Sequence, residues 1–367
     1  MDDPSSGDRD RAGRFRAQLL TGPPATSVLG VVERLLAVQA QDPRGFRLAV
    51  RARSRGLSAA DVEHALTVDR SVVVTWANRG TLHLVRTEDH SWLHALTTPQ
   101  LRVTNARRLA QEGVSPDDAV RGVRAIERAL TADGPLTRAQ LRERVAAAGL
   151  RVEGQAFVHV LFRGEIEGVS VRGPVVDGEH AHVLVRDWLG APPPALDRTV
   201  ALTRLAERYL AGHGPAGDRD LARWAGIGLG EVRRGLAGLG SRLRDVGGGL
   251  VDLAGREPAP PAPPAPLLLG AFDPLLLGWS AREWLLDGSA GIVTSNGIFR
   301  PFALVDGRAA GTWAMPGGQV ALAPFEPLPA AVAQTLAVEA ADVVRFLTGA
   351  AAGGPAGLPR SDLRTGR

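Results

Sequence analysis

The chain has 367 residues, of which 44% are hydrophobic and 22% charged, so it has the composition of a soluble globular protein and a length that favours two to four domains. It has no cysteine and all 43 basic residues are arginine, which excludes thiolate chemistry, disulfides and lysine Schiff bases. The formal net charge is only +4, no apolar run is long enough to cross a membrane and the N-terminus lacks a signal core, so we expect a cytoplasmic protein.

The first hundred residues predict three helices followed by a two-stranded hairpin. A helix that starts after Ser27 places Leu29, Val32 and Leu35 on one face, and we expect it to end near Pro43. Further elements are predicted in chain order as helices over 46–56 and 58–66 and strands over 71–77 and 81–85. This order is typical of a winged helix, a variant of the helix-turn-helix.

The same plan recurs twice. Helical and then β-rich patterns follow one another over 135–189, and again over 201–253. Three similar units of this size predict tandem winged helices. The predicted division of the chain is 1–100, 101–190 and 191–256 for the three units, 257–266 for a linker, 267–350 for a C-terminal segment and 351–367 for a tail.

The linker and the C-terminal segment have clear local signals. Residues 257–266 are too rich in proline for a helix or a central strand, and they predict a stiff extended connection. Strands over 298–305 and 309–315 flank Asp306-Gly307-Arg308, and Asp-Gly between apolar runs predicts a tight hairpin turn. A helix is predicted over 331–347, and a loose tail after residue 353.

Several reaction classes have no sequence support. A Walker loop, a dinucleotide fingerprint and a GxSxG motif are all absent. The histidine pairs His90/His94 and His180/His182 are spaced to share a face but have no carboxylates at ligand spacing, so they are weak metal candidates. We therefore expect neither a metal nor another cofactor.

Basic residues concentrate near the first predicted winged helix. No acidic residue interrupts the cluster, which consists of Arg44, Arg47, Arg51, Arg53 and Arg55. The chain after residue 254 has eight arginines against nine acidic residues, so the positive charge belongs to the helical units. A surface that faces nucleic acid and a solvated helix face explain this cluster equally well.

Two glutamines give the sequence an unusual polar feature. Gln39 and Gln41 follow an apolar helix and precede Asp42 and Pro43. On a continuing helix, residues two apart point about 200° from each other, so the amides would not act together. Pro43 biases Asp42 out of the helical region, which allows both amides to converge on one cavity. The alternative is a frayed helix end in water, and the spacing by itself favours it.

Four segments in order resemble one family. Residues 39–45 (QAQDPRG), 79–85 (RGTLHLV), 271–279 (AFDPLLLGW) and 304–313 (LVDGRAAGTW) are similar to the AlkZ-like winged-helix DNA glycosylases, which are associated with azinomycin resistance. The resemblance implies an α+β fold of three tandem winged helices with a C-terminal β-rich segment, shaped as a C-shaped DNA clamp. A related branch has Asp at the second motif position, so Gln41 favours the azinomycin-type branch.

The resemblance also implies roles for individual residues. Gln39 and Gln41 would orient a water and stabilise the transition state. The turn at Asp306, Gly307 and Arg308 would approach the lesion, and Arg79 and His83 would contact the DNA backbone or support the site, although a solvated Arg79 and a purely structural His83 are open alternatives. The full set of predicted DNA-binding residues is Arg44, Arg47, Arg51, Arg79, His83, Asp306, Gly307 and Arg308. Asp273 before Pro274 is expected to form a turn, and Trp76, Trp279 and Trp313 to lie in the core.

Two amides suffice chemically for one kind of lesion. A purine alkylated at its N7 position is already cationic and leaves as a neutral base, so little acid assistance is needed. What remains is to stabilise an oxocarbenium-like sugar and hold a water. We therefore predict a monomeric, monofunctional glycosylase that acts on duplex DNA carrying alkylated or crosslinked purines. Because its substrate is DNA, we expect it to be associated with the nucleoid. The alternatives are a transcriptional regulator and a winged-helix scaffold that binds protein.

Overall fold

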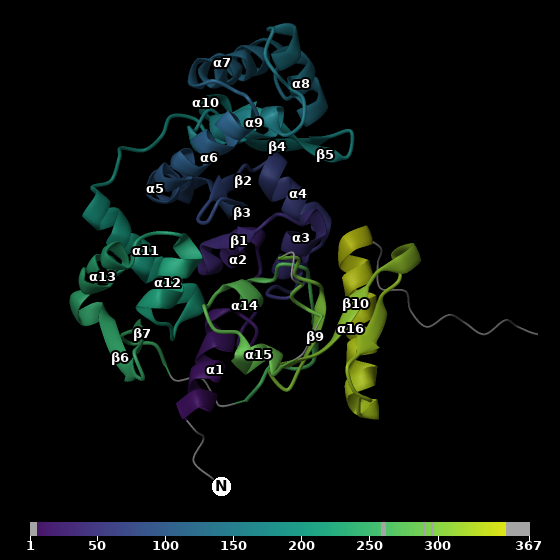
Figure 1. The fold of residues 1–367 in the computed structure, drawn as a ribbon. Coiled ribbons are helices and arrows are strands. Elements are labelled where there is room, and N and C mark those ends of the chain that lie inside the picture. Colours follow the sequence, from purple (N-terminus) through teal and green to yellow (C-terminus); the bar gives the residue numbers. More distant parts are fainter. Residues whose placement is uncertain (1–5, 258–261, 289–290, 295–296, 350–367) are drawn as a thin grey trace, which may run out of the picture.

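The computed structural model describes residues 6–257, 262–288, 291–294 and 297–349. The first of the three predicted units lies at the centre of the molecule, with the second above it, the third to the left and the C-terminal segment below and to the right (Figure 1). In the described part of the chain, no helix combines the length and the apolar character needed to cross a bilayer.

The first unit has the element order of a winged helix, with one difference from the sequence expectation. Its elements are α2 (Val28–Leu35), β1 (Ala37–Gln39), α3 (Pro43–Arg51), α4 (Ala59–Thr67), β2 (Val72–Ala77) and β3 (Thr81–Arg86). The predicted helix to Pro43 is wrong, because α2 ends at Leu35 and the chain continues as strand β1. Leu36 has a positive φ of 64°, which turns the chain from helix into strand. The strands form an antiparallel sheet in the order β1-β3-β2.

The second and third units repeat this order. The second consists of α7 (Pro116–Asp133), α8 (Arg138–Ala147), α9 (Ala156–Ile166), β4 (Ser170–Val176) and β5 (Glu179–Leu184). The third consists of α11 (Arg198–His213), α12 (Asp218–Ala225), α13 (Leu229–Ala237), β6 (Leu243–Gly247) and β7 (Leu250–Leu253). A single bridge replaces the first strand in each, Leu136 with His182 and Ala216 with Val251.

Shared structure fuses the units to one another. The wings of the first two units form one five-stranded sheet in the order β1-β3-β2-β4-β5. Trp76 of β2 packs against Phe162 of α9 with ring centroids 4.6 Å apart, although it is half-buried and not the core residue expected. Helices α5 (Thr87–Thr97) and α6 (Pro99–Gln111) connect the first two units. The buried Asp89 of α5 binds Arg204 and Arg208 of α11 at 3.2 and 3.0 Å.

The C-terminal segment forms a second sheet and a covering helix. Its elements are β8 (Leu267–Leu269), α14 (Pro274–Leu277), α15 (Glu283–Leu286), β9 (Phe302–Val305), β10 (Arg308–Ala314), β11 (Ala321–Pro324) and α16 (Ala330–Thr348), and the sheet order is β11-β10-β9-β8. The predicted Asp-Gly turn is confirmed, with φ of 50° at Asp306 and 74° at Gly307. The predicted proline-rich connection shows neither helix nor strand over 262–266, and the tail after residue 353 lies outside the described residues.

Two arginines of the basic cluster hold α3 to the C-terminal segment. Arg51, with 3% of its side chain exposed, binds Glu339 and Asp342 of α16, each at 2.8 Å. Arg53 is fully buried and binds Asp273 through two hydrogen bonds of 2.9 and 2.7 Å. The expectation that Arg51 contacts DNA is therefore not supported, because protein carboxylates occupy its guanidinium. Asp273 also caps α14 through the Leu275 N–H, which confirms it as a turn former.

Candidate active site

The two glutamines meet at the end of strand β1. Side chains two residues apart share one face of an extended chain, so the strand brings together what a helix would separate. The Gln39 Nε2 donates a hydrogen bond of 2.6 Å to the Gln41 Oε1. Gln39 is 7% exposed and its Oε1 is buried without a partner among the described residues, whereas Gln41 is exposed. The site therefore has one oriented amide with a free acceptor, next to solvent.

His83 lies directly across the sheet from Gln39. The two residues are paired in the register of β1 and β3, so their side chains are neighbours on one face. Burial lowers the pKa of His83 to about 4, and the charge of Arg79 acts in the same direction. Its Nδ1 donates to the Thr81 carbonyl at 2.9 Å, which leaves Nε2 as an acceptor. The imidazole is therefore neutral at physiological pH.

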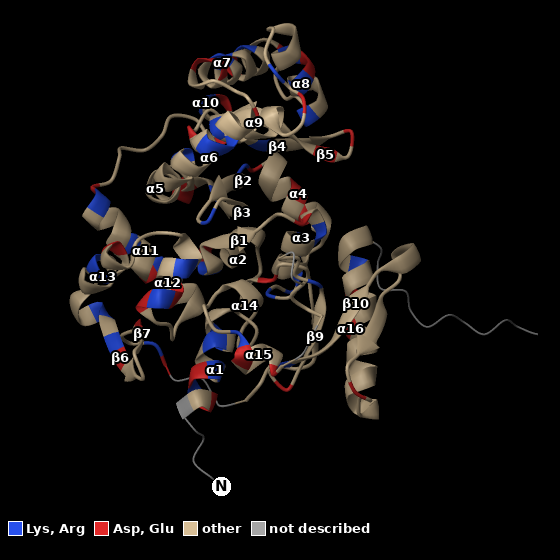
Figure 2. Ribbon diagram, in the orientation of Figure 1, with Lys and Arg blue, Asp and Glu red and all other residues tan. Residues whose placement is uncertain are grey.

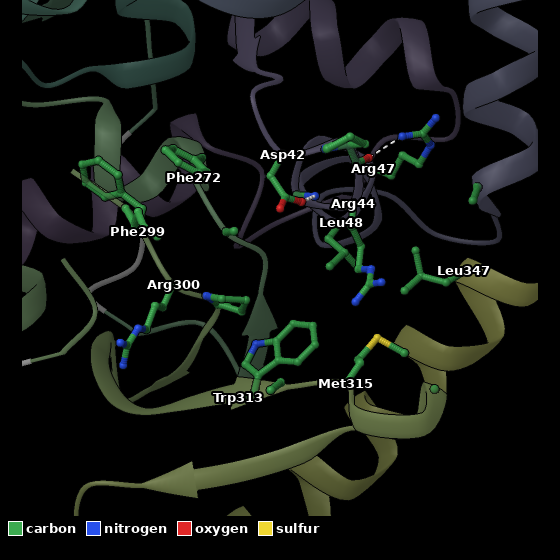
Figure 3. Close-up of a pocket in the computed structure, with 18 residues that line it drawn as sticks. Asp42, Arg44, Arg47, Leu48, Phe272, Phe299, Arg300, Trp313, Met315 and Leu347 are labelled. Carbon is green, nitrogen blue, oxygen red and sulfur yellow. Dashed lines mark hydrogen bonds between the residues drawn. The ribbon is translucent and has the colours of Figure 1, made fainter. Parts of the chain in front are cut away.

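A cavity of about 940 Å³ is lined by Asp42, the residue after Gln41, and by residues of α3 and the C-terminal segment. Figure 3 shows Arg44 and Leu48 of α3 on one side, Trp313 and Met315 on the opposite side, and Phe272 and Phe299 together at one end. Gly45 allows this arrangement, because a Cβ there would lie 2.3 Å from the Ala271 carbonyl oxygen. Two of the sequence segments singled out above, 39–45 and 271–279, thus form adjoining walls.

The predicted arginines differ in their availability. Arg44 is exposed at the cavity and its guanidinium has no hydrogen bond or ion pair within the described part of the chain. Arg47 instead binds Glu63 of α4 through an ion pair and contacts the Pro43 carbonyl. Arg79 donates to the carbonyls of Arg223 and Trp224, at 3.0 and 3.2 Å, and so ties the first wing to the end of α12. Of these three arginines, Arg44 is the one whose guanidinium is free to bind a ligand.

The turn at Asp306, Gly307 and Arg308 lies at the far end of its hairpin from the cavity. Trp313, Ala314 and Met315 line the cavity, and seven residues of extended strand between Arg308 and Met315 span roughly 23 Å. A Cβ on Gly307 would lie 3.1 Å from the Phe15 ring, so the turn packs on α1 (Ser6–Ala17), while Arg308 pairs with Asp287. This position gives no support to the expectation that the turn approaches the lesion, which stays a prediction. The connection that follows β10 reaches the cavity instead.

The histidine pairs serve other contacts. His90 stacks on His94 at 5.3 Å, and His182 lies 3.2 Å from the buried Glu165. His180 lies 3.4 Å from Arg47. No cluster of three or more metal-ligand side chains occurs among the described residues.

Sequence reasoning missed the far walls of the cavity. Phe272 and Phe299 lie against each other at 5.4 Å, and Arg300 follows Phe299. Trp279 and Trp313 are buried as expected, at 3% and 5% exposed, but Trp313 also lines the cavity. Phe272 and Trp313 fall in segments that carry the family resemblance, but no local pattern marks Phe299 or Arg300, which join the cavity wall through the packing of the C-terminal segment on α3.

Charge is distributed unevenly over the elements. Figure 2 shows arginines on α6, α8 and α11 to α13, whereas β9, β10 and most of α16 carry little charge. Helix α4, which occupies the place of the recognition helix in the first unit, carries Asp61 and Glu63 and no arginine. A helix of that charge is unsuited to the major groove of DNA.

Comparisons with known proteins agree in pointing to one family. The family model for AlkZ-like DNA glycosylases matches residues 32–346. The chain is 27% identical to an interstrand DNA cross-link repair glycosylase of Streptomyces sahachiroi, over 91% of this chain and 94% of the relative. It is also similar to the solved structure of the S. sahachiroi DNA glycosylase AlkZ, with a TM-score of 0.73 and 25% identity over 94% of this chain and 97% of that one.

Proposed function

Because the chain belongs to the AlkZ-like DNA glycosylase family, we propose that it hydrolyses the N-glycosidic bond of purines alkylated at N7, including bulky adducts and interstrand crosslinks. The cross-link repair activity in the name of the S. sahachiroi relative supports this substrate class. The geometric observation that carries the proposal is the hydrogen-bonded amide pair with the unpaired Gln39 Oε1, directly before the residues Asp42 to Gly45 that line a cavity.

The reaction needs a water and a stabilised sugar cation. The bond between C1′ and the purine nitrogen breaks, its electron pair goes to the cationic base, and the base leaves neutral. Water adds to C1′ and releases a proton, which gives an abasic site. The Gln39 Oε1 accepts a hydrogen bond from that water and faces the developing positive charge with a neutral dipole. Gln41 fixes the Gln39 amide through the 2.6 Å hydrogen bond.

Neighbouring residues support this pair. Neutral His83 gives Gln39 a polar neighbour without placing a second cation beside the sugar. Arg44 binds a DNA phosphate next to the site. The connection from Met315 to Val320 approaches the lesion in place of the turn at Asp306, because it borders the cavity.

The proposed enzyme is monofunctional and monomeric. The absence of lysine leaves no side-chain amine for a covalent lyase step, so the abasic strand should stay intact after base release. A mechanism with a single site needs only one chain. An enzyme that acts on chromosomal DNA lies in the cytoplasm, associated with the nucleoid. Light scattering of the free protein tests whether it is a monomer, because it measures the molar mass in solution.

The function is tested by measuring release of 7-methylguanine from duplex DNA under single-turnover conditions. We expect Gln39→Ala and Gln41→Ala each to lower the rate constant about 10²- to 10³-fold, since the first removes the dipole aimed at the transition state and the second removes the hydrogen bond that orients it. The matched control is Gln111→Ala, an exposed glutamine at the end of α6, which should release base at the wild-type rate.

DNA binding must be measured beside the rate. Affinity for the same duplex should be unchanged in both site variants, because the amides act on the sugar and not on the backbone. A wild-type rate in the variant that combines Gln39→Ala and Gln41→Ala would contradict the assigned roles, and strand cleavage at the abasic site would contradict a monofunctional enzyme.

A further inference from the structure

The cavity lined by Asp42 to Gly45, the residues that follow Gln41 in the chain, is much larger than a small lesion requires. Its volume of about 940 Å³ suits a drug-sized ligand. A methyl group has about the volume of a water molecule, ~30 Å³. The glycosidic bond of 7-methylguanine could therefore be cut without using this space.

Aromatic rings form one end of the cavity. Phe272 and Phe299 are both half-buried, with centroids 5.4 Å apart and planes tilted by 50°. Arg282 lies 5.2 Å from the Phe299 centroid and supports that ring. Phe272 has a φ of 55°, which is strained for a bulky residue. The fold thus holds an aromatic side chain at the cavity in a costly backbone conformation.

The charges that line the cavity restrict what enters it. Arg44 and Arg300 are exposed there and neither guanidinium has a partner among the described residues, while Asp42 accepts a hydrogen bond from the Gly45 N–H at 2.5 Å. Two unpaired cations repel a cationic purine but attract the phosphates on either side of it. The apolar part of the cavity then suits a neutral, flat group.

Resting on the proposed function, we propose that this cavity is a subsite for the adduct and not for the base: it binds a planar aryl group carried by the N7 substituent. The rings of Phe272 and Phe299 pack against the aryl group, and Trp313 and Met315 close the opposite side. The charged purine and its sugar stay at Gln39 and Gln41. The lesion therefore need not leave the duplex as a whole nucleotide.

Two substrates that share the cationic guanine but differ in its N7 substituent test this subsite. Duplex DNA carries one guanine with either a benzyl or a methyl group at N7, and base release is measured with excess enzyme and corrected for spontaneous depurination. We expect wild type to release 7-benzylguanine faster, and Phe299→Ala to lower that rate constant about tenfold while 7-methylguanine changes less than about twofold, because an aromatic contact area is lost only for the aryl substrate.

Two further variants control for folding and for general effects. Phe299→Leu retains apolar volume and should give an intermediate loss on the benzyl substrate with normal melting behaviour. Phe325→Ala removes a ring that is 41% exposed and does not line the cavity, and it should change neither rate. Equal losses on both substrates, or an unchanged benzyl rate, would overturn the subsite while leaving the glycosylase activity in place. A wild-type protein that releases neither base would refute the proposed function, and this inference with it.

Discussion

Five arginines that lie close together in the sequence have different surroundings in the fold. Arg51 and Arg53 are buried ion-pair partners, Arg47 is paired with Glu63, and Arg44 is exposed and free among the described residues. Burial and pairing depend on elements more than 200 residues away, such as Asp273 and Glu339. Clustering in the sequence therefore overstated how many of these residues can contact DNA.

Arg44→Gln should weaken DNA binding through charge alone. We expect the slope of log affinity against log salt to fall in magnitude by about 1, as for loss of one phosphate contact, with thermal stability unchanged. Fluorescence anisotropy with undamaged duplex at several salt concentrations measures the slope. Arg121→Gln on α7 gives the same change in net charge at a residue already paired with Asp118. Equal slopes for the Arg44 variant and wild type would remove Arg44 from the DNA-binding surface.

At the scale of elements, the pairing of α3 with α16 depends on Arg51. This arginine binds two carboxylates of α16 and the Leu268 carbonyl of β8. We expect Arg51→Ala to lower the free energy of unfolding by about 2 kcal/mol, less than for a fully buried pair because Glu339 and Asp342 stay partly hydrated. Urea denaturation measures this loss.

Arg55→Ala is the matched control for that measurement. Arg55 is exposed, so its truncation should change stability by less than about 0.5 kcal/mol. A similar loss in both variants would show that Arg51 has no special role in holding α16. Because Arg51 is buried, its loss should also leave the salt dependence of DNA binding unchanged, in contrast to Arg44.

The sequence predicted elements with local signals better than it predicted the site. The Asp306-Gly307 turn, the helix predicted over 58–66 and strands β2 and β3 agree with their patterns. Strand β1 was missed because it is three residues long and is defined by pairing with β3, more than forty residues away. The convergence of the two glutamines was anticipated from the proline, but its physical cause is an extended strand and not an unwinding helix.

The element scale also separates the glycosylase from the regulator alternative. In the second unit, α9 occupies the place of the recognition helix and packs against β2 and α6, so protein covers it. In the first unit, α4 is acidic. In these two units, the helix that a regulator would place in the major groove is therefore covered or of the wrong charge, which agrees with the family assignment. Helix α13 of the third unit differs, because it carries Arg233 and Arg234.

At the scale of the whole molecule, buried neutral histidines link stability to pH. Burial lowers the pKa of His83 to about 4 and those of His90 and His213 to about 3. Each folded value lies below the unfolded value of about 6.5, so the unfolded chain binds protons first. Their contribution to stability is complete above pH 6.5 and is lost as the pH falls towards 4 and 3.

We therefore expect the free energy of unfolding to fall between pH 6.5 and 4, with each histidine contributing at most about 1.4 kcal/mol per pH unit. Urea denaturation at pH 7, 6 and 5 measures the slope. His90→Gln should reduce that slope, because it removes one group that the unfolded state protonates. A stability that is constant from pH 7 to 5, or a His90 variant with the wild-type slope, would show that these histidines are hydrated or charged in the folded protein. In that case the neutral His83 beside Gln39 would lose its support as well, since its state rests on the same burial.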